Sequence, residues 1–594
     1  MKKYLLVLVG LCCVLSYALA ERPDYPELKK SDANIIGHVL DKKTKEHLPY
    51  ITIALKGTTI GTVTDATGHY FLKNLPEGNF ILEVSSVGYK TVTRNVTLKK
   101  GKTLEEDFEI EEDAIALDGV VVSANRSETT RRMAPTLVNV VDLKLFETTN
   151  SSTLSQGLNF QPGVRVETNC QNCGFQQVRI NGLDGPYTQI LIDSRPVFSA
   201  LSGVYGLEQI PASMIERVEV MRGGGSALFG SSAIAGTINI ITKEPLRNSG
   251  QLSHTITSLG GSSSFDNNTS LNASLVTDDH RAGLYIFGQN RYRSGYDYDG
   301  DGFTELPKLK NQTVGFRSYL KTSTYSKLTF EYHHMQEFRR GGDMLNRPPH
   351  EAHIAEQLQH SIDGGSLKFD YFSPDEKNRL SVFASAANTD RDSYYGPGND
   401  PLKAYGKTTD LTAMGGAQYV HTFDKCFFMP SDLTAGLEYN RDRLKDNMWG
   451  YNRHTDQTVN IYSAFLQNEW KNDRWGILIG GRLDKHNMVD NVIFSPRANL
   501  RFNPTQNINL RLSYSSGFRA PQAFDEDMHI ENVGGTVAMI ERAKDLKEEK
   551  SQSFSVSADM YHRFGAFQTN LLIEGFYTRP VSYTHLRAHE TAAN

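Results

Sequence analysis

Runs of alternating apolar and polar residues fill the chain beyond residue 246. In one run Leu328, Phe330 and Tyr332 alternate with polar residues, and the segment from Ile508 to Tyr514 repeats the pattern. A period of two places the apolar residues on one face of a β-strand. Each run is about ten residues long and ends at a turn-forming or long polar segment, as in an antiparallel membrane β-barrel. Residues 246–580 are therefore predicted to form part of such a barrel.

The composition is polar, yet it fits this prediction. Hydrophobic residues make up 39% of the chain and charged residues 22%. The lipid face of a barrel strand uses only alternate residues, so a running average hides its apolar half. The formal net charge of -5 argues against a nucleic-acid partner. Of five cysteines only Cys170, Cys173 and Cys426 lie beyond residue 20, which is too few for a disulfide scaffold.

The first 20 residues have the features of a signal peptide. Lys2 and Lys3 precede an apolar run over residues 4–15, and the sequence YALA at 17–20 ends in a small-x-small pattern. The run is short, and no second apolar span of about 20 residues follows, which disfavours a membrane anchor. Residues 1–20 are therefore predicted to be removed on export.

The stretch Ile215–Pro245 joins a charged strand-like run to a glycine-rich turn and a second strand. Its charged members are Glu216, Arg217, Glu219 and Arg222. They alternate with β-branched residues, which predicts a strand with one face on a core and charges on the other. Gly223–Gly225 permit a tight reversal, and TINIIT at 237–242 is typical of a buried strand. The turn lacks the Lys-Ser/Thr of a P-loop and the spacing of a dinucleotide motif, so a phosphate cradle is disfavoured.

Residues 34–112 are predicted to form a separate β-sandwich of about seven strands. Ile51, Ile53 and Leu55 alternate with their neighbours, and turn signals such as the Pro-Glu-Gly at 76–78 separate the runs. The order of these runs resembles the carboxypeptidase-regulatory-like domain. This resemblance implies no peptidase activity, and the segment shows no zinc-ligand pattern. An accessory or docking role is therefore expected.

A linker with an extended segment, residues 113–125, follows the sandwich. Its sequence LDGVVVS comprises Leu117, Asp118, Gly119, Val120, Val121, Val122 and Ser123. Three consecutive valines favour an extended strand that adds to a sheet edge. The segment resembles a TonB box, by which an energy-coupling protein grips an outer-membrane transporter, although Gly119 stands where the family usually has an acidic residue. The alternative is that these residues are the last strand of the sandwich.

Residues 126–245 resemble the plug domain of TonB-dependent outer-membrane receptors. The motifs MAPTLVNVVD, LNFQPGVRVE, VRINGLDGPYTQILIDSRPV and the run from Ile215 to Pro245 occur in the family's order. SSGFRAPQ at 515–522 also resembles a barrel motif of the same family. The resemblance implies an all-β protein with an α+β plug inside a barrel. It also implies that Arg217 and Arg222, with Glu216 and Glu219, latch the plug to the barrel wall; the alternative is that these are solvated strand charges.

The predicted strands do not complete such a barrel. About fifteen candidate strands precede Tyr577, whereas plugged barrels of this kind have about 22. An open sheet edge is not tolerated in lipid, so the barrel is expected to be truncated here. Residues 581–594, VSYTHLRAHETAAN, neither alternate nor end in an aromatic strand. They are predicted to be an anomalous, foreign or frame-shifted tail.

The plug contains two cysteines in a polar loop, Cys170 and Cys173, followed by Phe175. At this spacing the two thiols either bind a soft metal or close a small disulfide. A tetrahedral metal site would need His or Cys from elsewhere in the chain. The loop that carries Cys170, Cys173 and Phe175 is predicted to face outward and to contact substrate.

Two barrel loops carry residues that bind metals in other proteins. Asp297, Asp299, Asp301 and Glu305 match the start of a calcium loop, although Lys308 replaces the bidentate Glu of an EF-hand. The alternative is a solvated acidic turn. Five histidines crowd the next region: His333, His334, His350, His353 and His360. They are expected to be surface-loop histidines, with a haem or metal-chelate contact as the alternative.

The resemblance implies a receptor-transporter in the outer membrane of a Gram-negative bacterium, with its N-terminal domain in the periplasm. Its partners would be TonB with the inner-membrane energising complex, outer-membrane lipid and a small metal chelate such as a siderophore, haem or cobalamin. No nucleotide site or nucleophile-base pair stands out, so an enzyme is not expected and no cofactor is required beyond the predicted calcium. The alternatives are a polysaccharide or oligosaccharide importer with a surface lipoprotein partner, and a surface adhesin or binding protein without transport.

Overall fold

The computed structural model describes most of the chain. The described residues are 30–65, 67–86, 89–111, 120–196, 206–231, 233–277, 280–397, 404–524, 528–533, 536–540, 546–564, 567–582 and 588–591. The predicted signal peptide, residues 1–20, lies outside them. So do Leu117, Asp118 and Gly119 of LDGVVVS, residues 117–123, which we call the valine segment.

The N-terminal unit is a β-sandwich. Its strands are β1 (Lys30–Asp41), β2 (Thr52–Leu55), β3 (Gly61–Val63), β4 (His69–Pro76), β5 (Gly78–Ser86), β6 (Tyr89–Leu98), β7 (Thr103–Glu105) and β8 (Phe108–Ile110). One sheet has the order β4-β1-β7 with β8 also on β1, and the other has the order β3-β2-β5-β6. Ile53, Leu55, Leu82 and Val84 are fully buried between them. The alternation seen in the sequence thus builds the core of this unit.

The plug follows as an α+β unit. Its elements are β9 (Val120–Val121), β10 (Thr129–Thr130), β11 (Val138–Asp142), α2 (Leu143–Thr148), α3 (Leu154–Leu158), β12 (Val164–Cys170), β13 (Phe175–Ile180), η1 (Gly185–Tyr187), β14 (Thr188–Ile192), α4 (Gly206–Gln209), η2 (Ala212–Met214), β15 (Ile215–Arg222), α5 (Ser226–Phe229) and β16 (Gly236–Thr242). The central sheet has the order β11-β15-β16-β14, and β12 and β13 form a separate hairpin.

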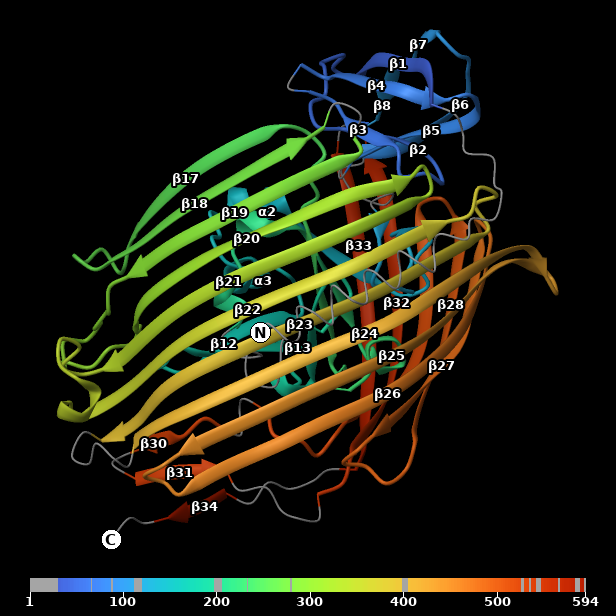
Figure 1. Ribbon diagram of the computed structural model, residues 1–594. Helices are drawn as coiled ribbons and strands as arrows, with labels where there is room; N and C mark the ends of the chain where they lie inside the picture. The colour runs from blue at the N-terminus through green and yellow to red at the C-terminus, as the bar shows by residue number, and fades with distance from the viewer. Residues whose placement is uncertain are drawn as a thin grey trace.

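Strand β15 differs from the prediction of one polar face. Both of its faces are buried: Val218 and Val220 pack in the plug core, while Glu219 on the other side is also inaccessible to solvent. The reason is that Val122 and Ser123 cover Glu219 inside a barrel sheet that curves around the plug (Figure 1). The glycine turn after β15 contacts this wall, because a Cβ on Gly224 would lie 2.5 Å from the hydroxyl of Ser515.

A fifteen-stranded antiparallel sheet forms the barrel wall, which agrees with the number of strands expected from the sequence. Its strands are β17 (Ser249–Ser258), β18 (Phe265–Val276), β19 (Ala282–Arg293), β20 (Lys308–Ser323), β21 (Ser326–Gly342), β22 (Ile354–Phe372), β23 (Asn378–Pro397), β24 (Tyr405–Cys426), β25 (Met429–Met448), β26 (Arg453–Lys471), β27 (Trp475–His486), β28 (Ile493–Thr505), β29 (Ile508–Arg519), β32 (Glu549–Phe564) and β33 (Phe567–Ser582). Within the described residues, β17 and β33 are the edges of this sheet.

The two faces of the sheet differ in polarity. On β29, Leu510 and Leu512 are 37% and 54% exposed on the outer face, whereas Asn509 and Arg511, which alternate with them, are buried toward the plug. An apolar exterior around a polar, filled interior is the arrangement of a membrane β-barrel. The predicted fold class, all-β with an α+β plug and an incomplete barrel, is therefore confirmed. Among the described helices, none is long and apolar enough to cross a membrane.

The two ends of the barrel sheet are unlike. At one end short turns join the strands, and the N-terminal sandwich contacts this end, where the Thr59 amide donates a 2.9 Å hydrogen bond to the carbonyl of Thr324 (Figure 1). At the other end lie long loops and a small sheet of β30 (Glu531–Val533), β31 (Thr536–Ile540) and β34 (Ala588–Thr591). The segment predicted to be an anomalous tail therefore contributes the end of β33 and all of β34.

Candidate functional site

The described half of the valine segment is bound to the plug. Val120–Val121 pair with Thr129–Thr130 as a two-stranded sheet, and Val121 and Ser123 are fully buried. The amides of Val122 and Ser123 each donate a 2.9 Å hydrogen bond to Oε2 of Glu219, and the Ser123 hydroxyl donates a third of 2.7 Å. Three donors on one carboxylate oxygen make Glu219 a clamp on this segment, because hydrogen bonds to a charged acceptor are the strong ones.

Glu219 is held in position by its neighbours in the plug. Arg217 donates from Nε to Oε1 of Glu219 over 2.9 Å and forms a 2.7 Å ion pair with Glu216. Burial by itself lowers the pKa of Arg217, but the two carboxylates outweigh it and the pKa is raised. The amide of Asn239 on β16 adds a 3.0 Å hydrogen bond to the Ser123 hydroxyl. The valine segment is thus tied to two strands of the central plug sheet.

Arg222, at the end of β15, reaches the barrel wall. Its guanidinium lies 2.5 Å from the carboxylate of Glu574 on β33 and donates a 3.2 Å hydrogen bond to the carbonyl of Pro162. Of the four residues predicted to latch the plug to the wall, Arg222 forms such an ion pair, whereas Arg217, Glu216 and Glu219 form ion pairs with one another. The reason is that Arg217 lies between two carboxylates of its own strand.

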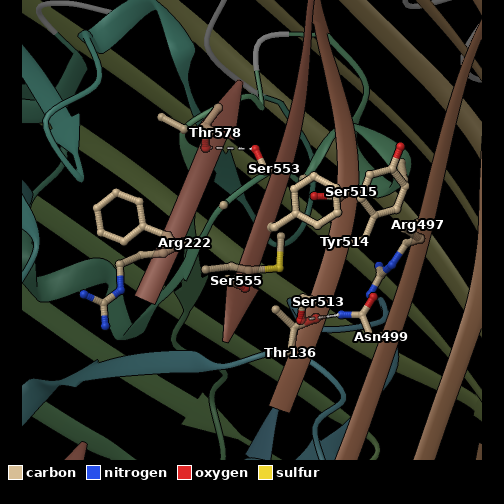
Figure 2. A pocket seen from close by; sticks show the side chains of 18 of the residues that line it. Thr136, Arg222, Arg497, Asn499, Ser513, Tyr514, Ser515, Ser553, Ser555 and Thr578 are labelled. Carbon is tan, nitrogen blue, oxygen red and sulfur yellow. Dashed lines mark hydrogen bonds between the residues drawn. The ribbon is translucent and has the colours of Figure 1, made fainter. Parts of the chain in front are cut away.

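A seam between plug and wall opens beside Arg222 (Figure 2). On the plug side it is lined by the glycine turn, Gly223–Gly225. On the wall side it is lined by small hydroxyl residues, Ser513, Ser515, Ser553, Ser555 and Thr578. Asn499 crosses the seam, donating a hydrogen bond to Thr136 of the plug and one of 3.1 Å to Ser513 of the wall. The seam therefore contains polar contacts beside apolar residues such as Met221, Phe554 and Phe576.

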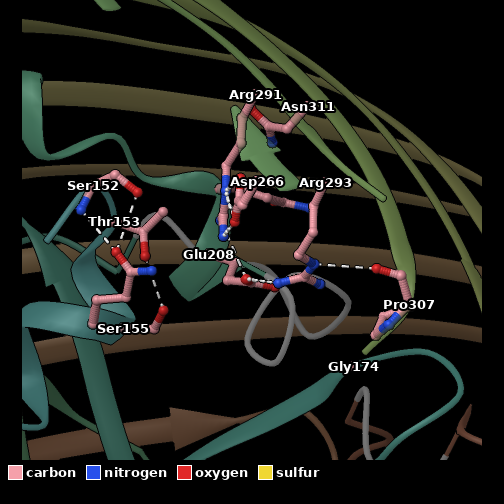
Figure 3. A network of polar contacts seen from close by, with 12 residues as sticks. Ser152, Thr153, Ser155, Gly174, Glu208, Asp266, Arg291, Arg293, Pro307 and Asn311 are labelled. Atoms are coloured by element: carbon pink, nitrogen blue, oxygen red, sulfur yellow. Dashed lines mark hydrogen bonds and ion pairs between the residues drawn. The ribbon is translucent and has the colours of Figure 1, made fainter. Parts of the chain in front are cut away.

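A second plug carboxylate, Glu208 on α4, lies among three arginines of the wall, two of which, Arg291 and Arg293, are labelled in Figure 3. Its oxygens are 3.2 Å from Arg291, 3.1 Å from Arg293 and 2.8 Å from Arg339. Burial by itself raises the pKa of Glu208, but these arginines outweigh it and lower the pKa to about 2 from its ordinary 4.5. Asp266 of the wall forms a 2.6 Å ion pair with Arg291. Glu208 thus forms ion pairs between plug and wall, as Arg222 of β15 also does.

Wall residues also contact the stretch between the valine segment and β11. Arg497 donates to the carbonyl of Ala124 over 2.9 Å, and Arg511 donates to that of Ala134 over 3.1 Å. Arg126 forms a buried ion pair with Glu438 of the wall. Movement of the valine segment would therefore pull on contacts between the plug and β25, β28 and β29.

The cysteine loop lies at the long-loop end of the molecule. Cys170 and Cys173 are thiols and not a disulfide. The sulfur of Cys170 lies 3.1 Å from a carboxylate oxygen of Glu356 at the start of β22, and that of Cys173 lies 3.3 Å from Nε2 of His529. Phe175 is 6% exposed, with its ring 5.1 Å from that of His529. The predicted substrate-facing residues are thus covered by the barrel loop that carries His529.

The Cys170 thiol and the His529 imidazole both have pKa values that differ from their ordinary ones. A hydrogen bond with Cys173 lowers the pKa of Cys170 to about 7, against the effect of burial, and His529 contributes further. Burial by itself lowers the pKa of His529, but hydrogen bonds with Cys170 and Glu356 outweigh it and raise the pKa to about 10. Both shifts thus come from hydrogen bonds within this cluster.

The acidic loop brings its four predicted residues together. One carboxylate oxygen from each of Asp297, Asp299, Asp301 and Glu305 lies within 4.8 Å of the others, and the three aspartates are exposed. Asp297 also accepts hydrogen bonds from the amides of Gly300 and Gly302, at 2.7 and 2.9 Å. Amide donors of this kind stabilise an acidic turn by themselves, so calcium binding stays a prediction.

Two of the five histidines expected on surface loops are instead buried in the wall. His333 and His360 are 5% and 3% exposed on the inner faces of β21 and β22. Nδ1 of His360 lies 3.6 Å from Glu337. The strands extend further into this region than the polar sequence indicated, because inward positions of a plugged barrel are polar and buried at once.

Known families match successive parts of the chain. The CarboxypepD_reg-like domain matches residues 35–122, the TonB-dependent receptor plug domain residues 130–237, and the TonB dependent receptor-like β-barrel residues 238–579. The last match alone covers more than half of the 594 residues. The chain belongs to the TonB-dependent receptor family.

Several characterised receptors and transporters are similar to it. The vitamin B12 transporter BtuB of Vibrio vulnificus strain CMCP6 is 24% identical over 425 residues, which cover 69% of this chain and 64% of BtuB. BtuB of strain YJ016 is 33% identical over 174 residues, 28% of each protein. The chain therefore spans less than two thirds of the length of these relatives.

Solved structures have the same fold. A mutant of the ferric enterobactin receptor PfeA from Pseudomonas aeruginosa has a TM-score of 0.61 at 18% identity, covering 76% of this chain and 71% of PfeA. The siderophore receptor PirA from Acinetobacter baumannii has a TM-score of 0.59 at 18% identity, covering 75% and 78%. At these identities the likeness shows the fold of this TonB-dependent receptor.

Three site residues of the receptor escaped the sequence analysis: Glu208, Glu356 and His529. Glu208 lies in a four-residue helix with no periodicity to detect, and its arginines come from strands 83 or more residues away. The sequence does contain a signal for the arginines, because Arg291 and Arg293 occupy inward positions of a strand with alternating residues. A charge at such a position in a plugged barrel needs a partner from the plug.

Replacing Glu219 with Gln is expected to loosen the valine segment. Hydrogen bonds to a charged group contribute about 1.5–3 kcal/mol each, so losing this carboxylate raises local opening at least about tenfold. Limited trypsin digestion of the folded receptor should then cut faster after Arg126, Arg131 or Arg132. Glu216→Gln is the matched control, because Glu216 pairs with Arg217 but is 43% exposed, and the amide and hydroxyl of Ser123 donate to Glu219 instead. Equal cutting of the two variants would contradict the clamp.

Replacing Glu208 with Gln is expected to weaken plug docking by about 3–5 kcal/mol, because three buried arginines lose their shared partner. Since the pKa of Glu208 is depressed to about 2, its contribution is complete above its ordinary 4.5 and is lost as the pH falls toward 2. Urea-induced release of the plug, followed by protease access at pH 7 and pH 3, measures both effects. Glu167→Gln, which alters a partly exposed ion pair within the plug, should have little effect. The same midpoint for both variants would contradict this role.

Proposed function

We propose that this receptor binds a scarce metal chelate and carries it across the outer membrane of a Gram-negative bacterium with energy delivered by TonB. The class of substrate is supported by relatives whose names specify vitamin B12, ferric enterobactin and siderophores. The substrate would be an iron siderophore, haem or cobalamin. Outer-membrane lipid would contact the apolar face of the sheet, and the sandwich at the short-turn end would lie in the periplasm.

One observation carries the coupling mechanism: the valine segment is hydrogen-bonded to Glu219, and Glu219 lies on the same strand as Arg222. Arg222 contacts the wall at Glu574, and Glu219 holds Val122 and Ser123. Strand β15 is a rigid link between the two, because it is paired on both sides within the plug sheet. A shift of the plug against the wall would therefore change the hold on the valine segment.

Release of this segment would give TonB a strand to bind. Val120 and Val121 already have extended backbone and a short partner strand, β10. A partner protein adding its own strand to this edge would gain main-chain hydrogen bonds at little ordering cost. Force on the strand would then be transmitted to Glu219 and, through Ala124 and Arg126, to the wall.

The seam beside the glycine turn is the candidate path for the substrate. Its wall is lined by hydroxyl groups, and one ion pair, Arg222 with Glu574, borders it. Small hydroxyl side chains can exchange their hydrogen bonds with water, so the seam would open at lower cost than an apolar contact. In the acidic loop near the long-loop end, Asp297, Asp299, Asp301 and Glu305 would hold calcium and stiffen the entrance.

The proposal is tested by substrate-limited growth of cells that depend on this receptor. Growth is compared on limiting ferric siderophore, haem, cobalamin or glycan, with Val121→Pro and Val121→Ala variants side by side. Proline removes a strand donor, so Val121→Pro should abolish uptake while surface binding of the substrate persists. Val121→Ala keeps the amide and should retain most uptake. Uptake that survives Val121→Pro would contradict strand addition, and dependence on glycan alone would contradict the chelate.

A further inference from the structure

Four potential metal ligands from three separate segments meet at the long-loop end of the receptor. Cys170 and Cys173 come from the plug hairpin, Glu356 from the start of β22, and His529 from the loop after β29. One ligand atom from each lies within 4.8 Å of all the others. A plug loop, a wall strand and an outer loop therefore converge on one point.

The separations are close to those of a tetrahedral zinc site. Cys170 Sγ lies 3.1 Å from Glu356 Oε2, Cys173 Sγ lies 3.3 Å from His529 Nε2, and His529 Nε2 lies 3.6 Å from Glu356 Oε2. Zinc bonds to sulfur, nitrogen and oxygen require ligand atoms to be about 3.4–3.8 Å apart in a tetrahedron. Each measured distance is within about 0.5 Å of that range, so a zinc ion needs only small shifts of the side chains.

The surroundings favour a bound cation. Cys173, Glu356 and His529 are at most 9% exposed, and the cluster is packed among Phe175, Leu358, Tyr395, Met448 and Ile530. Polar groups buried in such a place are costly unless they are paired, and one metal ion would pair all four ligands at once. The backbone also fits closely here, since a Cβ on Gly341 would lie 1.8 Å from the carbonyl oxygen of Asn172 in the Cys170–Cys173 turn. The turn is thus pressed against the wall with its sulfurs directed at the other ligands.

The donor set indicates which metal would bind. Two sulfurs, one imidazole nitrogen and one carboxylate oxygen suit zinc and related transition metals, whereas calcium and magnesium prefer oxygen alone. Four protein ligands with no open position are typical of sites that hold structure together. We infer that Cys170, Cys173, Glu356 and His529 bind a zinc-class divalent ion, which fastens the outer loop of the plug to the barrel. This site is independent of which chelate the receptor carries.

The consequence for the receptor is a removable clamp at the face opposite the valine segment. With the metal bound, the plug hairpin, β22 and the loop around His529 are held as one unit. Without it, these segments are joined by the hydrogen bonds and packing described above. The metal therefore sets how easily the outer part of the plug separates from the wall.

The binding test uses the purified, detergent-solubilised receptor, reduced and stripped of metal. Titration with Zn²⁺, with Ca²⁺ as the comparison, should give one retained zinc per chain and no retained calcium at this site. Substitution by Co²⁺ should give the absorption bands of tetrahedral thiolate coordination. Cys173→Ser and His529→Ala should each weaken zinc binding by more than about 100-fold, since even outer partners of metal ligands contribute 10–100-fold. Cys426→Ser removes a cysteine on a distant strand end and is the matched control, with zinc binding unchanged.

The clamp itself is tested by hydrogen exchange, which does not depend on any variant folding. At zinc concentrations about ten times Kd, exchange through local opening should slow by roughly tenfold in peptides that contain Cys173 and in those that contain His529. Slowing in both segments together would support the clamp. Zinc retention that is equal in the Cys173→Ser and Cys426→Ser proteins would overturn the assignment. So would receptor isolated without reductant that carries a Cys170–Cys173 disulfide and no zinc.

Discussion

A charge that is buried between the plug and the barrel wall must have a partner, and the arrangement of this receptor depends on that requirement. Arg222 is paired with Glu574, and Glu208 is shared by three wall arginines. Each such group would cost several kcal/mol if left unpaired in a dry interface. Once water enters, however, both partners are rehydrated and the cost disappears. A polar interface of this kind is stable while it excludes water and separates at low cost once water enters. An apolar core does not separate at low cost, because water does not compensate its exposed groups.

Strand β15 connects the valine segment to the contact between plug and wall. Its apolar residues belong to the plug core, while Glu219 holds the valine segment and Arg222 holds the wall. A strand with both faces buried cannot shift by one residue without exposing charges to the core, so its register is strongly fixed. The fixed register makes β15 a suitable link between contacts at the seam and the segment that a periplasmic partner would grip. The proposed metal clamp would act on the outer side of the same plug.

Much of this fold could be predicted from the sequence, because alternation with a period of two and the order of the plug motifs are local signals. The outward Leu510 and Leu512 and the inward Arg511 follow directly from that alternation. The pairing of charges could not be predicted, because it joins residues far apart in the chain. His529 lies 356 residues from Cys173, and Glu356 lies 186 residues from Cys170. The two further ligands that a metal site at these cysteines would need therefore became visible only in the folded chain.

In our proposal Glu219 keeps the valine segment docked until the plug moves. Hydrogen exchange at the amides of Val122 and Ser123 tests it directly, because both donate to Glu219. We expect slow exchange at both amides in the resting receptor, comparable with β15 and β16, and faster exchange after the chelate that supports growth is added. Rapid exchange at these amides in the resting receptor, or exchange that the chelate does not change, would contradict it.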